Sequence, residues 1–356
     1  MSKAMALFAA CSALTITIAA VPSVAASLKA VPLAPFNATD NLAGRMIREQ
    51  AIDKAFTGWV RKYHIKNAAL AIRDHGTVVD GPAFGSDSPS NPEPVASESK
   101  SVTAMCVLKL VEAGTLKFSD TLGSRLPDFF RANPPHDTAA RNITLAALLT
   151  HSSGIDSDPT QGSSLSQFKP YDQTEFAKEL AAALKAPLGQ PKYFYNNINY
   201  AALGLVIETV TGKSYEDFCR SQVLAPAGVN DAELNPPWRM MGSFGGWKLS
   251  ADDEAKFLAY FEPASNLVHT PANAWPKTPV GGGASYSLGV EMRADGAGFN
   301  FWHFGSWTAD SPKASFGAYF LSLPNGMGVA ATYQPTIDDS TGSALDTAMY
   351  DAATNP

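Results

Sequence analysis

The most informative stretch of this chain is Pro94-Val95-Ala96-Ser97-Glu98-Ser99-Lys100. Two of its side chains, Ser97 and Lys100, lie three residues apart, and residues at this spacing share one face of a helix. A serine hydroxyl is a poor nucleophile at neutral pH unless a base lies beside it. The stretch therefore presents Ser97 as a candidate nucleophile, with Lys100 as the group that takes its proton.

The residues after Lys100 predict a helix that begins near this pair. Ala104, Leu108 and Val111 recur at helical spacing, and Gly114 is typical of a residue that ends a helix. Free backbone N–H groups at a helix start favour developing negative charge. A serine at a helix start also commonly caps the helix. The motif alone therefore leaves both interpretations open.

The composition is that of a packed globular protein. The 356 residues are 45% hydrophobic and 17% charged, with a formal net charge of −6 and no long basic run. We expect one large domain or two modest ones, and no nucleic-acid partner. The sequence has no G-x-S-x-G, H-E-x-x-H or G-x-x-x-x-G-K-[ST] pattern, and its histidines do not cluster at metal-ligand spacing. We therefore expect neither a metal nor another cofactor.

Residues 1–26 are expected to be a secretory signal peptide. Lys3 supplies a positive charge, residues 6–21 are largely apolar, and residues 23–26 are small enough for a cleavage site. An uncleaved membrane anchor is the alternative, although the apolar run is short for a span. We expect a periplasmic or secreted protein with no membrane span after cleavage. Export would allow Cys106 and Cys219 to pair, but their spacing does not place them together, and Cys106 is expected to be a buried packing residue.

Strand signals occur at both ends of the chain, and helix signals dominate between them. We therefore expect an α/β (α+β) fold, in which an antiparallel sheet built from both termini is flanked by helices. Residues 27–356 would form a single domain, with an α/β lobe over about 38–115 and 241–356 and a mainly helical lobe inserted over about 116–240. The predicted strands are Ala68–Arg73, Thr77–Phe84, Ser287–Arg293, Phe299–His303, Ser315–Leu323 and Met327–Tyr333. The predicted helices are Asn41–His64, the segment after Ser97, Ile143–Leu149, Gln173–Leu184, Tyr200–Thr211, Tyr215–Val223 and Ser343–Ala353.

Four further segments follow the Ser97 stretch in a distinctive order. They are Leu110–Leu116 with Asp120 and Leu126–Phe129, then Ile143–Gly154, then Tyr195-Asn196-Asn197 with Tyr200 and Leu203-Gly204, and finally His303-Phe304-Gly305. In this order they resemble the serine β-lactamase and penicillin-binding-protein superfamily, in particular class C β-lactamases, D,D-peptidases and related esterases. The resemblance spans nearly all of the mature chain. It implies that superfamily's fold and its covalent acyl-enzyme chemistry.

The resemblance implies catalytic roles for three residues. Ser97 would be the nucleophile, and Lys100 would help to take its proton. Tyr195 would be the second proton-transfer group, with a phenol pKa, ordinarily about 10, that is lowered by the nearby lysine. Without the order of the segments, Tyr195 would be interpreted as a packing residue, because it lies in an aromatic cluster.

The resemblance also implies four substrate-binding residues. Asn197 would donate to the substrate carbonyl and to the lysine, and His303 would face the acyl group. Gly305 would let substrate lie close to its strand, since a side chain there would block it. The backbone N–H groups of Ser306 and of the nucleophile would form the oxyanion hole. Taken from the residues alone, Asn197 also fits a helix cap and His303 a satisfied strand histidine.

One departure from the family pattern bears on the substrate, because no K-[ST]-G triplet is present. Lys277-Thr278 is followed by Pro279, and His303 stands at the expected place. A lysine binds a carboxylate as a fixed charge, whereas a histidine does so only when protonated. We therefore expect an amide or ester hydrolase whose small-molecule or peptide substrate is a β-lactam, a D-amino peptide or a short ester. The alternative is a non-hydrolytic protein that binds cell-wall peptide or β-lactam and keeps the fold.

Overall fold

The computed structural model describes residues 42–162, 167, 174–234, 236–262, 265–308 and 315–356, so the predicted signal peptide lies outside it. The helices are α1 (Leu42–Lys62), α2 (Ser99–Glu112), α3 (Leu122–Arg125), α4 (Pro127–Ala132), α5 (Leu145–Leu149), α6 (Phe176–Ala183), α7 (Asn197–Thr211), α8 (Tyr215–Cys219), α9 (Ala251–Phe257) and α10 (Asp339–Thr354). The strands are β1 (Asn67–Asp74), β2 (Thr77–Phe84), β3 (Glu93–Pro94), β4 (Glu233–Leu234), β5 (Trp247–Leu249), β6 (Thr278–Gly281), β7 (Ala284–Ser287), β8 (Val290–Asp295), β9 (Gly298–Trp307), β10 (Phe316–Ser322) and β11 (Met327–Gln334).

The main sheet has eight strands in the order β2-β1-β11-β10-β9-β8-β7-β6, and every neighbouring pair is antiparallel. Strand β1 lies beside β11, with Asn67 opposite Gln334 and Asp74 opposite Met327. This order confirms the predicted antiparallel sheet built from both ends of the chain. Strand β9 pairs with β8 over residues 298–302 and with β10 over residues 301–307, so its last residues are held in register by β10.

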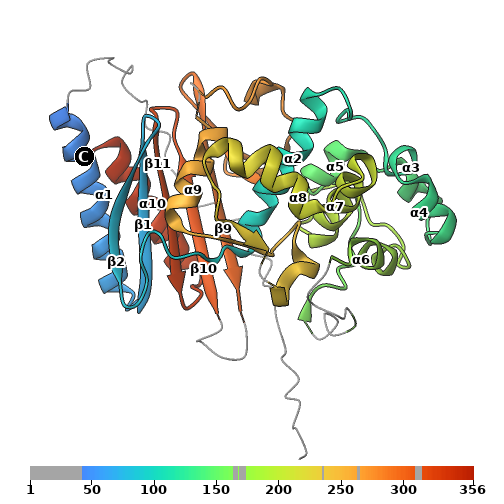
Figure 1. Cartoon of the computed structure of the whole chain (residues 1–356), viewed down its shortest axis with the longest axis horizontal. Helices are drawn as coiled ribbons and strands as arrows, with labels where there is room; N and C mark the ends of the chain where they lie inside the picture. Colours follow the sequence, from blue (N-terminus) through green and yellow to red (C-terminus); the bar gives the residue numbers. More distant parts are fainter. Residues whose placement is uncertain (1–41, 163–166, 168–173, 235, 263–264, 309–314) are drawn as a thin grey trace, which may run out of the picture.

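Helices cover both faces of this sheet (Figure 1). On one face α1 packs against α10, and the Trp59 indole N–H donates to the Thr341 carbonyl at 3.0 Å. On the other face α9 packs against β1, β2 and β11. The central strands are therefore buried on both sides, as the nearly continuous burial of β1 and β11 shows.

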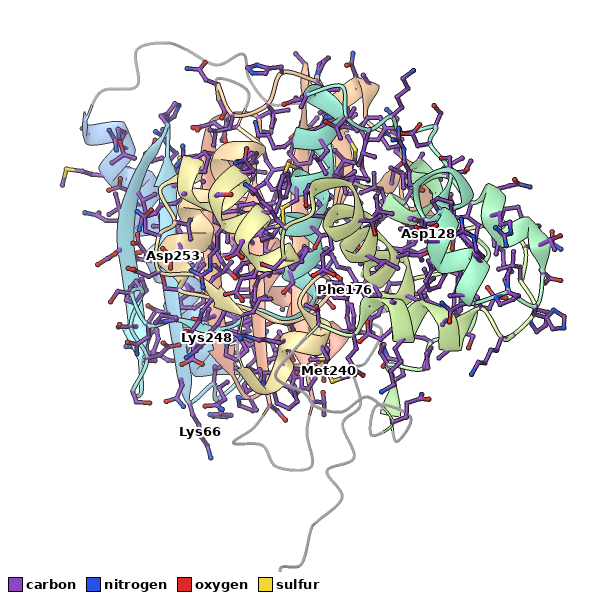
Figure 2. All side chains as sticks on the ribbon, turned by 45° about the vertical axis from the view of Figure 1, so that its right-hand side comes forward. Lys66, Asp128, Phe176, Met240, Lys248 and Asp253 are labelled. Atoms are coloured by element: carbon purple, nitrogen blue, oxygen red, sulfur yellow. A yellow bond between two sulfur atoms is a disulfide. The ribbon has the colours of Figure 1, made fainter. Side chains whose placement is uncertain are left out.

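Helices α3 to α8 form a second region beside the sheet (Figure 1). Figure 2 shows Asp128 of α4 in this region, whereas Lys248 and Asp253 lie over the sheet. Helix α2 is buried along almost its whole length, which is the pattern of a helix enclosed by protein on all sides. A disulfide joins Cys106 of α2 to Cys219 of α8 across 113 residues, with the Cα atoms 5.7 Å apart. The disulfide thus ties the helix after Ser97 to the helical region.

The predicted strand Ser287–Arg293 is wrong in its continuity, because the chain breaks it into β7 and β8 around Gly289. Gly289 has a φ of +74° and lies against the backbone of α2, where a Cβ would come within 2.5 Å of the Lys100 carbonyl oxygen. Only a glycine fits this close approach. The break therefore lets the sheet pack directly on the start of α2.

Candidate active site

The Ser97 turn is a short 3₁₀ segment, Ala96–Glu98, that runs directly into α2. Ala96 has a φ of 45°, a left-handed conformation that residues with a Cβ rarely adopt and that costs about 1–3 kcal/mol. The Ser97 hydroxyl makes no capping bond, and Glu98 occupies the cap position of α2. The N-cap interpretation of Ser97 therefore does not hold. Instead, the turn presents its hydroxyl to Lys100.

Lys100 is fully buried and donates to the Ser97 Oγ at 3.2 Å and to the Phe244 carbonyl at 2.8 Å. Burial lowers the pKa of Lys100 to about 7, although the carboxylate of Asp158 opposes this shift. A lysine with such a pKa is largely neutral just above pH 7. It can then accept a proton from the serine at the distance observed.

Tyr195 contacts the same hydroxyl. Burial raises the pKa of Tyr195, and a hydrogen bond with Ser97 only partly offsets this effect. The prediction that the lysine lowers this pKa is therefore wrong, because burial dominates. The ammonium of Lys100 lies over the phenol ring, 4.8 Å from its centroid. Tyr195 is thus a neutral phenol that can donate or relay a proton.

An aromatic cluster surrounds the phenol and includes His151, which lies in the Ile143–Gly154 segment. Its ring centroid is 4.3 Å from that of Tyr195 and 4.7 Å from that of Tyr286. The His151 Nδ1 lies 3.3 Å from the Asn196 backbone N–H and 3.0 Å from the Asn199 side-chain amide. Burial lowers the pKa of His151. The histidine is therefore a neutral support for the segment that carries Tyr195.

His303 extends from β9 toward the same cluster, with its Nε2 3.3 Å from the Tyr286 hydroxyl. Burial lowers the pKa of His303 to about 3, and the charge of Lys100 contributes to the shift. The imidazole is therefore neutral at physiological pH. It cannot supply the positive charge that a lysine would provide at this place.

Gly305 brings β9 into direct contact with the backbone that precedes the nucleophile. A Cβ at Gly305 would lie 2.1 Å from the Val95 carbonyl oxygen. The glycine is thus required by the packing of the protein itself, beyond its predicted role in substrate approach. Ser306 follows on the same strand and its hydroxyl is 2.7 Å from that of Thr336. Because Gly305 lies against Val95, the backbone of the next residue, Ser306, lies near the Ser97 turn.

Asn197 is directed away from Lys100 and toward another segment. Its side-chain amide donates to the Thr160 hydroxyl at 3.2 Å, and its backbone N–H donates to Asp158 at 3.0 Å. The residue that caps α7 is Asn196, whose side chain accepts from Ile198 N–H at 2.7 Å. The predicted contact between Asn197 and the lysine is absent from the hydrogen bonds of the described residues.

A family model described as Beta-lactamase matches residues 50–355 of the chain. The chain belongs to the beta-lactamase family. Members of this family are in general serine hydrolases. The family assignment confirms the resemblance found in the sequence, and the fold agrees with it.

Solved structures share this fold at low sequence identity. The beta-lactamase/D-alanine carboxypeptidase from Pseudomonas syringae has a TM-score of 0.69 at 15% identity, covering 85% of this chain and 98% of that chain. A D-stereospecific amidohydrolase from Streptomyces sp. has a TM-score of 0.66 at 19% identity, covering 85% and 97%. Protein flp of Staphylococcus aureus (strain N315) is 29% identical over 194 residues, which is 50% of this chain. The chain spans about a third of that relative's length, 36%.

Three parts of the site in this beta-lactamase-family chain escaped the sequence analysis. They are the Phe244 carbonyl, the carboxylate of Asp158 and the hydroxyl of Tyr286. The stretch Gly242-Ser243-Phe244-Gly245-Gly246 carried a usable signal, because glycines mark close backbone approach. A Cβ at Gly246 would lie 2.7 Å from the Trp238 carbonyl oxygen. No comparable signal pointed to the other two groups.

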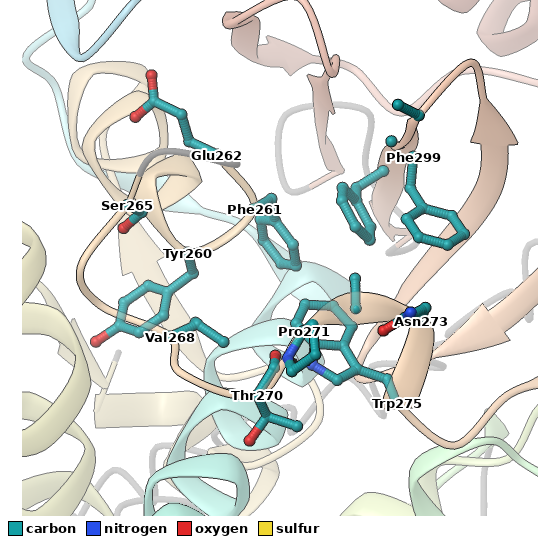
Figure 3. A pocket seen from close by; sticks show the side chains of 14 residues that line it. Tyr260, Phe261, Glu262, Ser265, Val268, Thr270, Pro271, Asn273, Trp275 and Phe299 are labelled. Atoms are coloured by element: carbon teal, nitrogen blue, oxygen red, sulfur yellow. Dashed lines mark hydrogen bonds between the residues drawn. The ribbon is translucent and has the colours of Figure 1, made fainter.

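A cavity of about 340 Å³ lies away from the nucleophile, near the C-terminal end of α2 (Figure 3). Glu112, the last residue of α2, accepts from the backbone N–H of Thr270 in its lining. The lining of the cavity includes none of Ser97, Lys100, Tyr195 or His303. The cavity is therefore distinct from the site. Its ring-bearing lining residues are Tyr260, Phe261, Trp275, Phe299 and Phe301.

The described residues contain neither a membrane-spanning helix nor a metal-binding cluster. No helix within the described ranges combines the length and apolar character that crossing a membrane requires. No group of three or more histidine, cysteine, aspartate or glutamate side chains in the same ranges is arranged to hold a metal ion.

Proposed function

We propose that this protein is a serine hydrolase that works through a covalent acyl-enzyme on Ser97. The observation that supports this most strongly is that one hydroxyl contacts two proton-transfer groups. Its oxygen is 3.2 Å from Lys100 Nζ and is hydrogen-bonded to Tyr195. A nucleophile with a base in reach and a second donor beside it is the arrangement that acyl transfer requires.

In acylation, neutral Lys100 takes the hydroxyl proton as the Ser97 oxygen attacks the substrate carbonyl carbon. The backbone N–H groups of Ser97 and Ser306 stabilise the oxyanion that forms. When the oxyanion collapses, the bond to the leaving group breaks. The proton passes from Lys100 through the Tyr195 phenol to that leaving group. Water then attacks the ester by the reverse path, which releases the acid and restores the serine.

Neutral His303 supports a substrate that needs no cationic partner on β9. Its pKa of about 3 leaves the imidazole uncharged under ordinary conditions. We therefore propose an uncharged acyl donor, such as a short ester, ahead of a D-amino peptide or a β-lactam carboxylate. The measurement is kcat/KM on nitrophenyl butyrate, a D-Ala-D-Ala peptide and nitrocefin. Preference for the peptide or for nitrocefin would contradict this order.

The nucleophile is tested by labelling with a fluorescent fluorophosphonate probe. Ser97→Ala should abolish labelling, because the hydroxyl that forms the covalent bond is removed. Ser101→Ala is the matched control, since that buried hydroxyl on the next turn donates to the Glu98 carbonyl at 2.6 Å. Equal labelling of wild type and Ser97→Ala would disprove the proposed role of Ser97. Labelling followed by no turnover of any ester, peptide or β-lactam would favour the non-hydrolytic binder instead.

We also propose that the chain is exported. The charged and apolar pattern of residues 1–26 supports this, and a disulfide suits an oxidising compartment. Expression of the full chain in a bacterium, followed by fractionation and intact mass measurement, tests the proposal. A protein that stays in the cytoplasm with residues 1–26 attached would contradict it.

A further inference from the structure

Two buried carboxyl groups lie behind the nucleophile, on the side opposite Lys100. Glu98, the residue after Ser97, is 2% exposed, and Glu254 of α9 is 1% exposed. The two carboxyl groups lie close enough for each to shift the pKa of the other. Apart from the Gly305 backbone N–H, which acts on Glu98, none of their four oxygens has a side-chain or backbone donor within the described part of the chain. Acylation as proposed above does not use either group.

No cation compensates this pair among the described residues. The basic groups on the surrounding elements are engaged elsewhere: Lys100 with Ser97 and Phe244, Lys256 of α9 with Asp252, Arg73 with Glu262, and Lys248 with Glu233. The titratable groups that interact electrostatically with the pair are Asp253, Tyr319 and Tyr333. All three are acids, so none of them favours two ionised glutamates.

Two ionised carboxylates in such a place would be strongly unfavourable. A buried charge without a partner costs several kcal/mol, and two adjacent like charges cost more. Burial raises the pKa of Glu98, and the proximity of Glu254 raises it further, while the backbone N–H of Gly305 lowers it. Burial likewise raises the pKa of Glu254. A proton held between the two groups satisfies both as donor and acceptor.

We propose that Glu98 and Glu254 are positioning residues that share a proton in a hydrogen bond and thereby hold the Ser97 turn against α9 and β9. This inference rests on the proposed role of Ser97. The turn needs such support, because Ala96 is in a left-handed conformation and the following strand contact is tight at Gly305. The buried pair links α9 to the Ser97 turn inside the protein. Loss of the shared proton would push the turn away from the oxyanion-hole strand.

The first experiment measures the free energy of unfolding of wild type and Glu98→Gln/Glu254→Gln by denaturant titration from pH 5 to pH 8. A retained proton means that the folded state binds more protons than the unfolded state above the ordinary glutamate range. Wild type should therefore lose about tenfold in its folding equilibrium constant per pH unit for each retained proton. The double variant cannot titrate at these positions and should lack this slope. An identical slope in both proteins would overturn the shared proton.

The second experiment measures the rate of fluorophosphonate labelling at pH 6. The double glutamine variant preserves shape and hydrogen bonding, so it should label at close to the wild-type rate. Glu254→Ala removes the partner of Glu98 and should slow labelling about tenfold or more, as expected when a shift of the turn misplaces the nucleophile. Equal labelling of Glu254→Ala and wild type would overturn the positioning role.

Glu179→Ala is the matched control, because Glu179 of α6 is also a fully buried carboxyl without a hydrogen-bond partner among the described residues. It should change unfolding but leave labelling unchanged. If the double variant does not fold, Glu254→Gln alone keeps a donor to Glu98, and it should label at close to the wild-type rate where Glu254→Ala does not. The unfolding series needs no catalysis. A failure of Ser97 to label would therefore disprove the proposed function without affecting the test of the shared proton.

Discussion

The two sides of the Ser97 turn carry opposite ionisable groups in equally dry surroundings. Lys100 faces the aromatic cluster, and Glu98 faces α9. Burial drives both toward their neutral forms, lowering the pKa of the lysine and raising that of the glutamate. The neutral lysine is the deprotonated form, whereas the neutral glutamate is the protonated form. Rising pH therefore prepares one side for catalysis and opposes the support given by the other.

The largest expected effect on the lysine side of the turn is that of Lys100→Met, which keeps the length of the side chain and removes the base. We expect kcat/KM to fall by about 10²–10⁴, the range for loss of a general base. Steady-state kinetics on the best substrate provide the measurement. Lys109→Met on the same helix serves as control, because Lys109 points to the Leu267 carbonyl near the far end of α2. A loss of less than threefold in Lys100→Met would remove the lysine from the mechanism.

Gly305→Ala tests whether the Ser97 turn must contact β9 on the side of the turn that carries Glu98. The added Cβ overlaps the Val95 carbonyl oxygen, and overpacking of this kind costs about 1–3 kcal/mol. We expect lower unfolding free energy together with slower labelling of Ser97. Gly58→Ala on α1 is the control, since a Cβ there meets no atom within 4 Å. Unchanged stability and labelling in Gly305→Ala would show that this contact is dispensable.

The smallest expected effect is the dependence of kcat/KM on pH that Lys100 causes. Because the active form of Lys100 is neutral and its pKa is about 7, kcat/KM should rise about tenfold per pH unit below that value and level off above it. The residual rate of Lys100→Met should lack this inflection. A wild-type profile that is flat between pH 5.5 and 8 would mean that another group accepts the proton.

Local patterns made much of the fold predictable. The first two strands, β1 and β2, have nearly the predicted bounds, and the short turn between them leaves them paired as a hairpin. Helix α7 was predicted to begin at Tyr200 and begins at Asn197, because the cap formed by Asn196 is a local hydrogen bond that periodicity does not register. The break at Gly289 depends on contact with α2, which is distant in sequence.

The site was predictable only where its residues lie in one motif. Ser97 and Lys100 are neighbours on one turn, so their contact follows from helical spacing. The Phe244 carbonyl accepts a hydrogen bond from Lys100, although the two residues are 144 positions apart. Because every residue has a backbone carbonyl, the residue type at position 244 does not indicate this contact. Glu98 lies between two serines, and such a polar neighbourhood does not predict that its carboxyl group is buried. Its burial depends on α9, and no pattern near residue 98 specifies that helix.

The pairing of β1 with β11 has a consequence for how the chain is made. Asn67 and Gln334 face each other across 267 residues. At 5–20 residues per second, a ribosome needs on the order of ten to fifty seconds to supply the partner of the first strand. Throughout that interval the edge of β1 that pairs with β11 in the native sheet is open, and such edges invite pairing with other chains. The sheet can therefore close only after β11 has left the ribosome.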